Sequence, residues 1–93
     1  MKTLTAAFIE RMDTLEEQLK KLKEQSTPHI EQGKLSSTTL TKFNNAEMQL
    51  AASRARLEAN QYEDAVYLFS RAYACMGEFL GRAAHEIQPN QSL

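Results

Sequence analysis

Residues 60–87 read NQYEDAVYLFSRAYACMGEFLGRAAHEI, and this stretch decides the fold class. Its apolar residues recur in steps of three and four for about six turns, which is typical of one buried face of a long helix. These residues are Tyr62, Ala65, Val66, Phe69, Ala72, Tyr73, Met76, Phe79, Leu80 and Ala83. Pro89 ends the pattern. We therefore predict a helix over about residues 61–87, with the preceding segment folded back alongside it and a polar tail at 88–93.

A second helix is predicted over about residues 38–59. A run of good N-cap residues, 36–39, precedes its first apolar residue, Leu40. The large apolar residues are Leu40, Phe43, Leu50 and Leu57, and the small ones are Ala46, Ala51, Ala52, Ala55 and Ala59. Small side chains let a neighbouring helix approach closely. Because Asn60 and Gln61 break the pattern over very few residues, the two helices are expected to form a tight antiparallel hairpin.

The N-terminal segment predicts a helix over about residues 3–25. Its large apolar residues step by four, three, four and three, which is a heptad seam about two heptads long. The residues of this seam are Phe8, Met12, Leu15, Leu19 and Leu22. Proline steers the residue before it away from the helical region, so Ser26-Thr27-Pro28 is expected to end the helix and begin a connection over 26–37. The seam packs either on the other two helices or on a partner, including another copy.

These elements together predict an all-α fold: a three-helix bundle with an antiparallel helical hairpin and a heptad-patterned N-terminal helix. The 93 residues are enough for one small domain, and 42% apolar and 25% charged residues are an ordinary globular balance. A core of this size is modest, so sharing apolar surface with a partner would add stability.

Two glycines interrupt the third helix. Gly77 and Gly81 are four residues apart, so they lie on one face, and each weakens a helix by about 1 kcal/mol relative to alanine. They indicate either local fraying or close helix packing, or else a groove where a partner backbone approaches.

The hairpin resembles a single tetratricopeptide repeat over residues 46–79. Residues 57–66 are similar to the turn of that family, and Ala65, Phe69 and Ala72 fall at the spacing of its second helix. The resemblance implies a helical hairpin of that geometry and a role in protein–protein binding.

No catalytic or metal-binding constellation is visible, so we expect no enzyme activity, no cofactor and no metal. His29, His85 and Cys75 are the only imidazole or thiol groups, and they do not occur at a metal-ligand spacing. Cys75 lies in an apolar stretch, where a buried and inert thiol is usual. A glycine-rich phosphate loop is also missing from the sequence.

The net charge of -1 offers no global attraction to nucleic acid or to an acidic membrane. Basic residues on the hairpin are diluted by acidic ones, and no apolar stretch reaches the roughly 20 residues of a membrane span. A single cysteine fits a reducing compartment, so we expect a cytoplasmic protein.

The expected function is a small non-enzymatic interaction module, such as an adaptor, cochaperone or inhibitor, of the kind found among bacterial or phage accessory proteins. The predicted partner-binding residues are those of the heptad seam, namely Phe8, Met12, Leu15, Leu19 and Leu22, with Tyr67 and Arg71 as secondary contacts. Two alternatives stay open: a homo-oligomeric helical scaffold, and a regulatory domain that binds a small ligand between the second and third helices.

Overall fold

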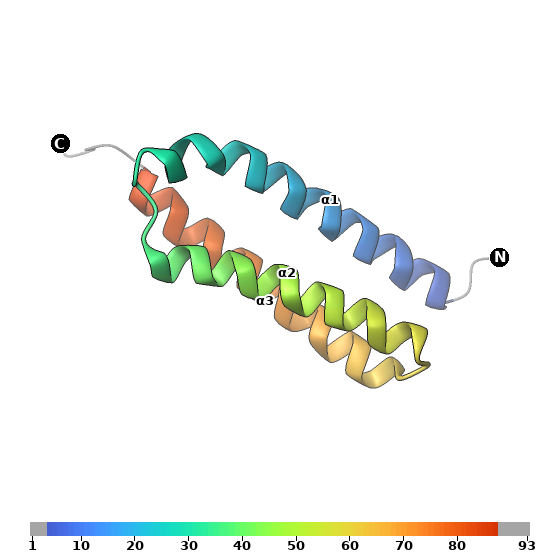
Figure 1. Cartoon of the computed structure of the whole chain (residues 1–93). Helices are drawn as coiled ribbons and strands as arrows, with labels where there is room; N and C mark the ends of the chain where they lie inside the picture. Colours follow the sequence, from blue (N-terminus) through green and yellow to red (C-terminus); the bar gives the residue numbers. More distant parts are fainter. Residues whose placement is uncertain (1–3, 88–93) are drawn as a thin grey trace.

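The computed structural model describes residues 4–87. Over this range the chain forms three helices, α1 (Leu4–Glu31), α2 (Ser37–Glu58) and α3 (Tyr62–Ile87), and no strand. Figure 1 shows the three helices side by side, with α2 antiparallel to α1 and to α3. The predicted all-α three-helix bundle is therefore confirmed. The predicted tail at 88–93 lies outside the described residues.

Small side chains make α2 and α3 the most closely packed pair of helices. Ala46, Ala65 and Ala72 are fully buried, and so is Ser53 on α2. The alanine-rich face predicted for α2 is only partly used, because Ala51, Ala55 and Ala59 are exposed. The common core consists of Met12, Leu15, Leu19, Leu35, Phe43, Ala46, Leu50, Leu57, Ala65, Ala72, Cys75, Met76, Phe79 and Ala83.

The prediction that Ser26-Thr27-Pro28 ends the first helix is wrong, because α1 continues through Pro28 to Glu31. Hydrogen bonds beyond the proline close the last turn: Gly33 N–H donates to the Ile30 carbonyl and Lys34 N–H to the His29 carbonyl. This is the Schellman arrangement, and Gly33 supplies its left-handed residue at φ 71°. The connection to α2 therefore spans only residues 32–36.

The α2–α3 turn closes in the same way. Asn60 takes the left-handed position at φ 63°. Its N–H donates to the Leu57 carbonyl, and the Gln61 N–H donates to the Arg56 carbonyl. Asparagine tolerates this backbone conformation better than most residues, so the sequence break at 60–61 has a direct structural cause.

A carboxylate joins the end of α3 to the start of α2. Glu86 accepts hydrogen bonds from the Ser36 backbone N–H at 2.9 Å, the Ser36 hydroxyl at 2.9 Å and the Thr39 hydroxyl at 2.8 Å. Ser36 is also the N-cap of α2, and its hydroxyl accepts from the Thr39 N–H. The Ser36 N–H lowers the pKa of Glu86 most; partial burial opposes this, and the two hydroxyls and Arg82 add to the lowering.

Replacing this carboxylate is predicted to destabilise the protein in a pH-dependent way. Because the folded pKa of Glu86 lies below its ordinary value of 4.5, the ionised group stabilises the fold fully above that pH. This contribution is lost as the pH falls through the folded pKa. Urea unfolding should therefore separate Glu86→Gln from wild type at pH 7, and the two should converge in strong acid.

The matched control is Glu24→Gln, which removes an exposed carboxylate from α1 and should unfold like wild type at pH 7. A difference between Glu86→Gln and wild type that is equally large at both pH values would contradict the assigned role.

Candidate functional site

The predicted partner-binding seam of α1 lies against the chain's own hairpin. Met12, Leu15 and Leu19 have exposed fractions of 0%, 1% and 3%. Phe8 and Leu22, at the two ends of the seam, are half-buried and pack on the same core. Of the two options open from the sequence, the structure shows the internal one, so these residues are not available to a partner in this conformation.

The two secondary contacts, Tyr67 and Arg71, are exposed on the outer side of α3. At about 100° per residue, Tyr67 lies roughly 120° around the helix from Tyr73. The structure does not bring these two residues together with the seam of α1.

The single buried face predicted for α3 is wrong in part. Tyr62, Val66, Tyr73 and Leu80 belong to the predicted face, yet 41–55% of each is exposed. The buried part of the pattern faces α2, and Phe69 and Met76 meet α1. A third row of apolar residues is left over, because two neighbouring helices cannot cover the whole apolar arc of α3.

A mostly polar row on α1 faces this exposed apolar row. Its members each precede a seam residue by one position, so they repeat the seam's steps of four and three. They are Ala7, Arg11, Thr14, Gln18 and Lys21, and we call them the α1 wall. Arg11 and Lys21 have no ion-pair partner among residues 4–87.

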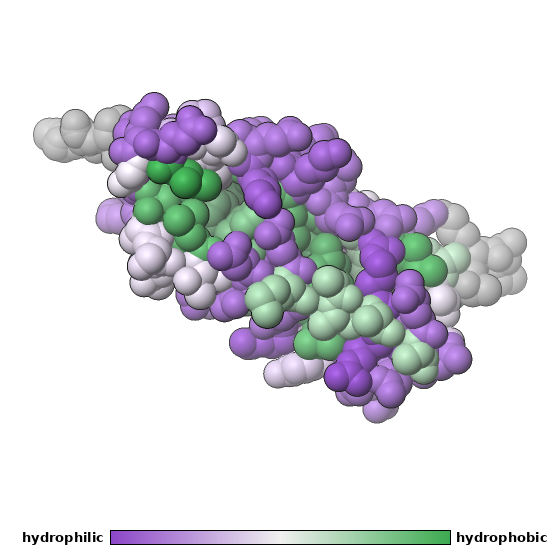
Figure 2. Space-filling view, in the orientation of Figure 1, coloured by the Kyte–Doolittle hydropathy of each residue, from purple (hydrophilic) through white to green (hydrophobic). Residues whose placement is uncertain are grey.

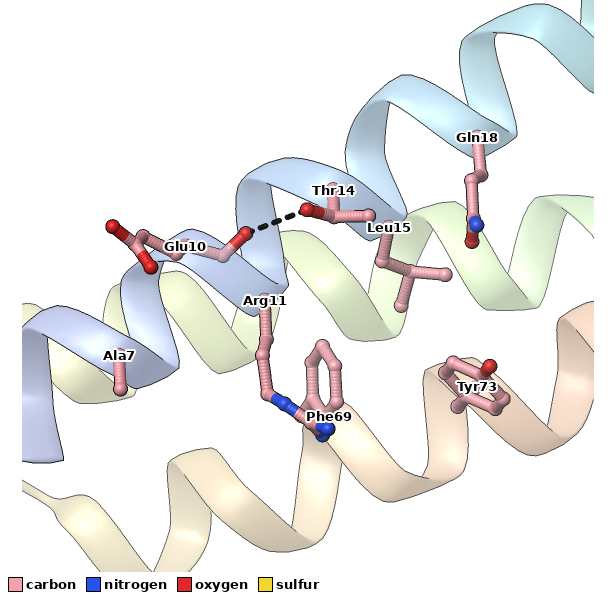
Figure 3. Close-up of a pocket in the computed structure, with 8 residues that line it drawn as sticks. All are labelled: Ala7, Glu10, Arg11, Thr14, Leu15, Gln18, Phe69 and Tyr73. Carbon is pink, nitrogen blue, oxygen red and sulfur yellow. Dashed lines mark hydrogen bonds between the residues drawn. The ribbon is translucent and has the colours of Figure 1, made fainter.

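Two hollows, of about 460 and 310 Å³, lie between the α1 wall and α3, and both are lined by Gln18 and Tyr73. A separate hollow of about 350 Å³ lies near the start of α1 and α3, where Leu4, Val66 and Leu57 of α2 are among its lining residues. Figure 3 shows Arg11 and Leu15 reaching from α1 while Phe69 and Tyr73 rise from α3 on the opposite side. We call these hollows together the α1–α3 groove.

Aromatic rings form the floor of the groove. The Phe69 ring lies edge-on to Phe8, with centroids 5.3 Å apart, and 6.2 Å from the Tyr73 ring. Such contacts fix ring orientation and add to the energy of burial. The floor is therefore ordered before anything binds to it.

The other side of the molecule has a different character. Figure 2 shows the face where α2 lies in front, and hydrophilic residues there separate the apolar patches. In the described chain, the ion pairs that join α1 to the hairpin all go to α2. Arg54 lies 3.0 Å from Asp13 and 3.3 Å from Glu16, and Lys23 lies 3.9 Å from Glu47. These ion pairs connect α1 to α2. Within residues 4–87, no ion pair connects α1 to α3.

Small residues border the groove on the outer side of α3. They also step by four and three, and all are exposed: Ser70, Ala74, Gly77, Gly81 and Ala84, which we call the small edge. A Cβ atom added at Gly77 or Gly81 would meet no other group within 4 Å. Packing inside the chain therefore does not require these glycines, and the helix continues unbroken to Ile87.

The three residues considered as metal ligands, Cys75, His85 and His29, do not lie together in the structure. Cys75 is buried, with its sulfur 4.0 Å from the Gln49 amide oxygen, and His85 is exposed near the end of α3. The Nδ1 of His29 is buried and has no hydrogen-bond partner within the described range. Within residues 4–87, no three His, Cys, Asp or Glu side chains are grouped so that they could hold a metal ion.

In the described part of the chain, none of the helices combines the length and the apolar character that crossing a membrane requires.

No protein-family model matches this chain, and no curated protein or solved structure matches it either.

Two glycine substitutions are predicted to change stability in opposite directions. Gly33→Ala should destabilise by about 1 kcal/mol, because an L-residue is strained at positive φ. Gly77→Ala should stabilise by about 1 kcal/mol, because it raises helix propensity where the new methyl group meets open space. Chemical unfolding followed by circular dichroism in dilute solution measures both. A destabilising Gly77→Ala would show that the small edge is packed within the chain.

Proposed function

We propose that this chain is a non-enzymatic protein-binding module whose α1–α3 groove takes up an amphipathic helix. The observation that carries the proposal is the exposed row Tyr62, Val66, Tyr73 and Leu80 beside an ordered aromatic floor. Contiguous exposed apolar surface rimmed by polar residues is typical of protein interaction sites.

The spacing of the row favours a helical occupant. Val66, Tyr73 and Leu80 repeat every seven residues, which is the period at which one helix meets another along a shared seam. A helix laid in the groove would contact α1 on one side and α3 on the other, as in helix-in-groove recognition. It would complete the apolar arc of α3 that α1 and α2 leave uncovered.

The polar wall would set the orientation of the bound helix. Arg11 and Lys21 sit about 15 Å apart along α1, at 1.5 Å per residue. Between them, Thr14 and Gln18 offer neutral hydrogen-bonding groups. A partner helix with an apolar face and carboxylates along one flank fits this arrangement.

A binding role fits the groove better than acid–base chemistry does. Among residues 4–87, Glu10 is the one carboxylate that lines the hollows of the groove, and neither histidine nor cysteine lines them. Nucleic-acid binding has less support, because Lys42, Arg54 and Arg82 each pair with a carboxylate. The resemblance of the hairpin to a tetratricopeptide repeat points the same way, towards an adaptor, cochaperone or inhibitor.

A library of helical peptides tests the proposal. The peptides are about three heptads long, apolar at two positions of each heptad and varied elsewhere. Peptides selected for wild-type binding should lose at least about tenfold in affinity for Tyr73→Glu or Leu80→Glu, because a charge enters the apolar row. They should bind Met48→Glu normally, because this variant adds the same charge at an exposed apolar residue of α2.

Backbone amide shifts on titration then locate the peptide. Changes along α1 and α3 are expected. Peptides that bind both groove variants as tightly as wild type would contradict the assignment of the groove. Amide shifts centred on Tyr67 and Arg71 would contradict it as well.

A further inference from the structure

We infer that the helix in the α1–α3 groove belongs to another protein, runs antiparallel to α1 and α3, and carries a bulky apolar anchor near its C-terminal end. It also carries two carboxylates, one about four and one about fifteen residues before the anchor, and we call these the near and far positions. This inference rests on the proposed function of the groove and names the chemistry of its partner.

The hollow at the start of α1 and α3 is suited to the anchor. Phe8, Val66 and Leu57 line it, one from each helix, and among residues 4–87 no charged side chain lines it. Its volume of about 350 Å³ lies in the range of cavities that hold ligands. Because large apolar side chains buried in such pockets are the usual anchors of an interface, the bound helix should place its largest apolar side chain here.

Helix dipoles favour one direction for the bound helix. α1 and α3 run parallel, since Phe8 lies against Phe69 at one end while Lys21 and Leu80 line the same hollow at the other. A helix that runs opposite to both places its positive N-terminus beside their negative C-termini. Its C-terminal end, with the anchor, then lies at the start of α1 and α3.

The two cations of the α1 wall lie at the heights of the near and far positions. Leu4, Thr5 and Phe8 are the α1 lining of the anchor hollow. From their middle, Arg11 lies about 8 Å and Lys21 about 23 Å further along α1, at 1.5 Å per residue. The near and far positions of an antiparallel helix rise about 6 and about 22 Å from the anchor, so each reaches the level of one cation.

Helix handedness puts the near and far positions on the side that faces α1. Viewed from the start of α3, Glu86 beside α2, Met76 beside α1 and the exposed Tyr73 follow one another clockwise. A helix in the groove therefore has α1 clockwise of its anchor and α3 anticlockwise of it. Counted back along an antiparallel helix, the near and far positions lie about 40° and about 60° clockwise of the anchor, towards α1.

Both cations are available for this pairing. Among residues 4–87, neither Arg11 nor Lys21 has an ion-pair partner. Figure 3 shows the Arg11 side chain extending from α1 on the groove side. Complementary charges at the edge of an interface fix register and exclude wrong partners more than they add affinity. The carboxylates therefore act as the selective feature of the partner, and the anchor supplies the apolar contact.

The chain's own helices do not carry this pattern, so a second copy is not the occupant. Within residues 4–87, the carboxylates that lie eleven residues apart are Asp13 with Glu24 and Glu47 with Glu58. Four residues after the first pair stands Pro28, which is not a bulky apolar anchor. Four residues after the second pair stands Tyr62, which lies beyond the turn that ends α2.

Two helical peptides of identical composition test the inference by fluorescence anisotropy with the full chain. Each is about three heptads long, with a phenylalanine anchor and an apolar seam. One has glutamates at the near and far positions. The other exchanges each glutamate with a glutamine about two residues closer to the C-terminus, which turns the carboxylates by about 200° to the solvent side.

The first peptide should bind at least about tenfold more tightly at low salt, because its carboxylates meet Arg11 and Lys21. The difference should shrink in about 1 M salt, where ion pairs are screened. Equal affinities at low salt would overturn the inference.

Charge reversal tests the direction of the bound helix. Arg11→Glu should weaken binding about fivefold or more, and a lysine at the near position, not at the far one, should restore it. Lys21→Glu should show the opposite preference. Lys20→Glu is the matched control, because Lys20 lines a hollow between α1 and α2 and should bind normally. Rescue of Arg11→Glu by the far lysine would overturn the antiparallel direction.

A second cycle tests the anchor. Replacing the phenylalanine of the peptide by alanine should weaken binding to wild type at least about tenfold. The same replacement should matter little for Val66→Trp, whose larger ring occupies the hollow. Val66 is 52% exposed, so this variant should fold, as circular dichroism can verify. An equal loss on both proteins would overturn the position of the anchor.

The outcomes separate this inference from the function on which it rests. Selected peptides that need Tyr73 and Leu80, while the two designed peptides bind equally, would overturn the inference and leave the groove as a binding site. Selected peptides that bind Tyr73→Glu and Leu80→Glu as tightly as wild type would overturn both. Groove amide shifts that change with the concentration of the chain alone would overturn the assignment to another protein.

Discussion

Residues from all three helices meet at one buried contact. Met12, Ser53 and Ala65 are all fully buried. The Ser53 hydroxyl donates to the Ala65 carbonyl and lies 3.7 Å from the Met12 sulfur. A small residue on α2 and another on α3 allow these helices to pack closely, and the flexible methionine of α1 fills the remaining space. The position of α1, and with it the shape of the groove, depends on this contact.

The packing at that contact explains why only part of the apolar surface of α3 is buried. One row of this helix, which includes Ala65, Ala72 and Phe79, is buried, and a second, which includes Phe69 and Met76, meets α1. The third, Val66, Tyr73 and Leu80, is covered by neither α1 nor α2. A three-helix bundle can cover only part of so wide an apolar arc, and the remainder is a surface suited to a fourth helix. The proposed binding role would therefore follow from how many helices the chain supplies.

Local patterns in the sequence account for the helices but not for all of their contacts. Periodicity and the break at 60–61 place α2 and α3 within one residue of their predicted ends. The end of α1 differs because Pro28 falls in the last turn, where the hydrogen bonds of the Gly33 motif close the helix beyond it. Glu86 was not foreseen, since its partner Ser36 is 50 residues away in the chain. The open row of α3 was also missed, because periodicity shows that a face is apolar without showing how many neighbours cover it. The sequence did contain a sign of the α1 wall. Its residues recur in steps of four and three, one position before the residues of the apolar seam.

The packing of α1 on its own hairpin is the central claim, because it both buries the predicted seam and forms the groove. Isotope-filtered nuclear Overhauser spectroscopy on a mixture of labelled and unlabelled chains tests it most directly. Contacts between the Phe8 and Phe69 rings, and between the Met12 methyl group and Ser53, should arise within a single labelled chain. If these contacts appeared only between labelled and unlabelled chains, α1 would be exchanged between copies and the account of the groove would be contradicted.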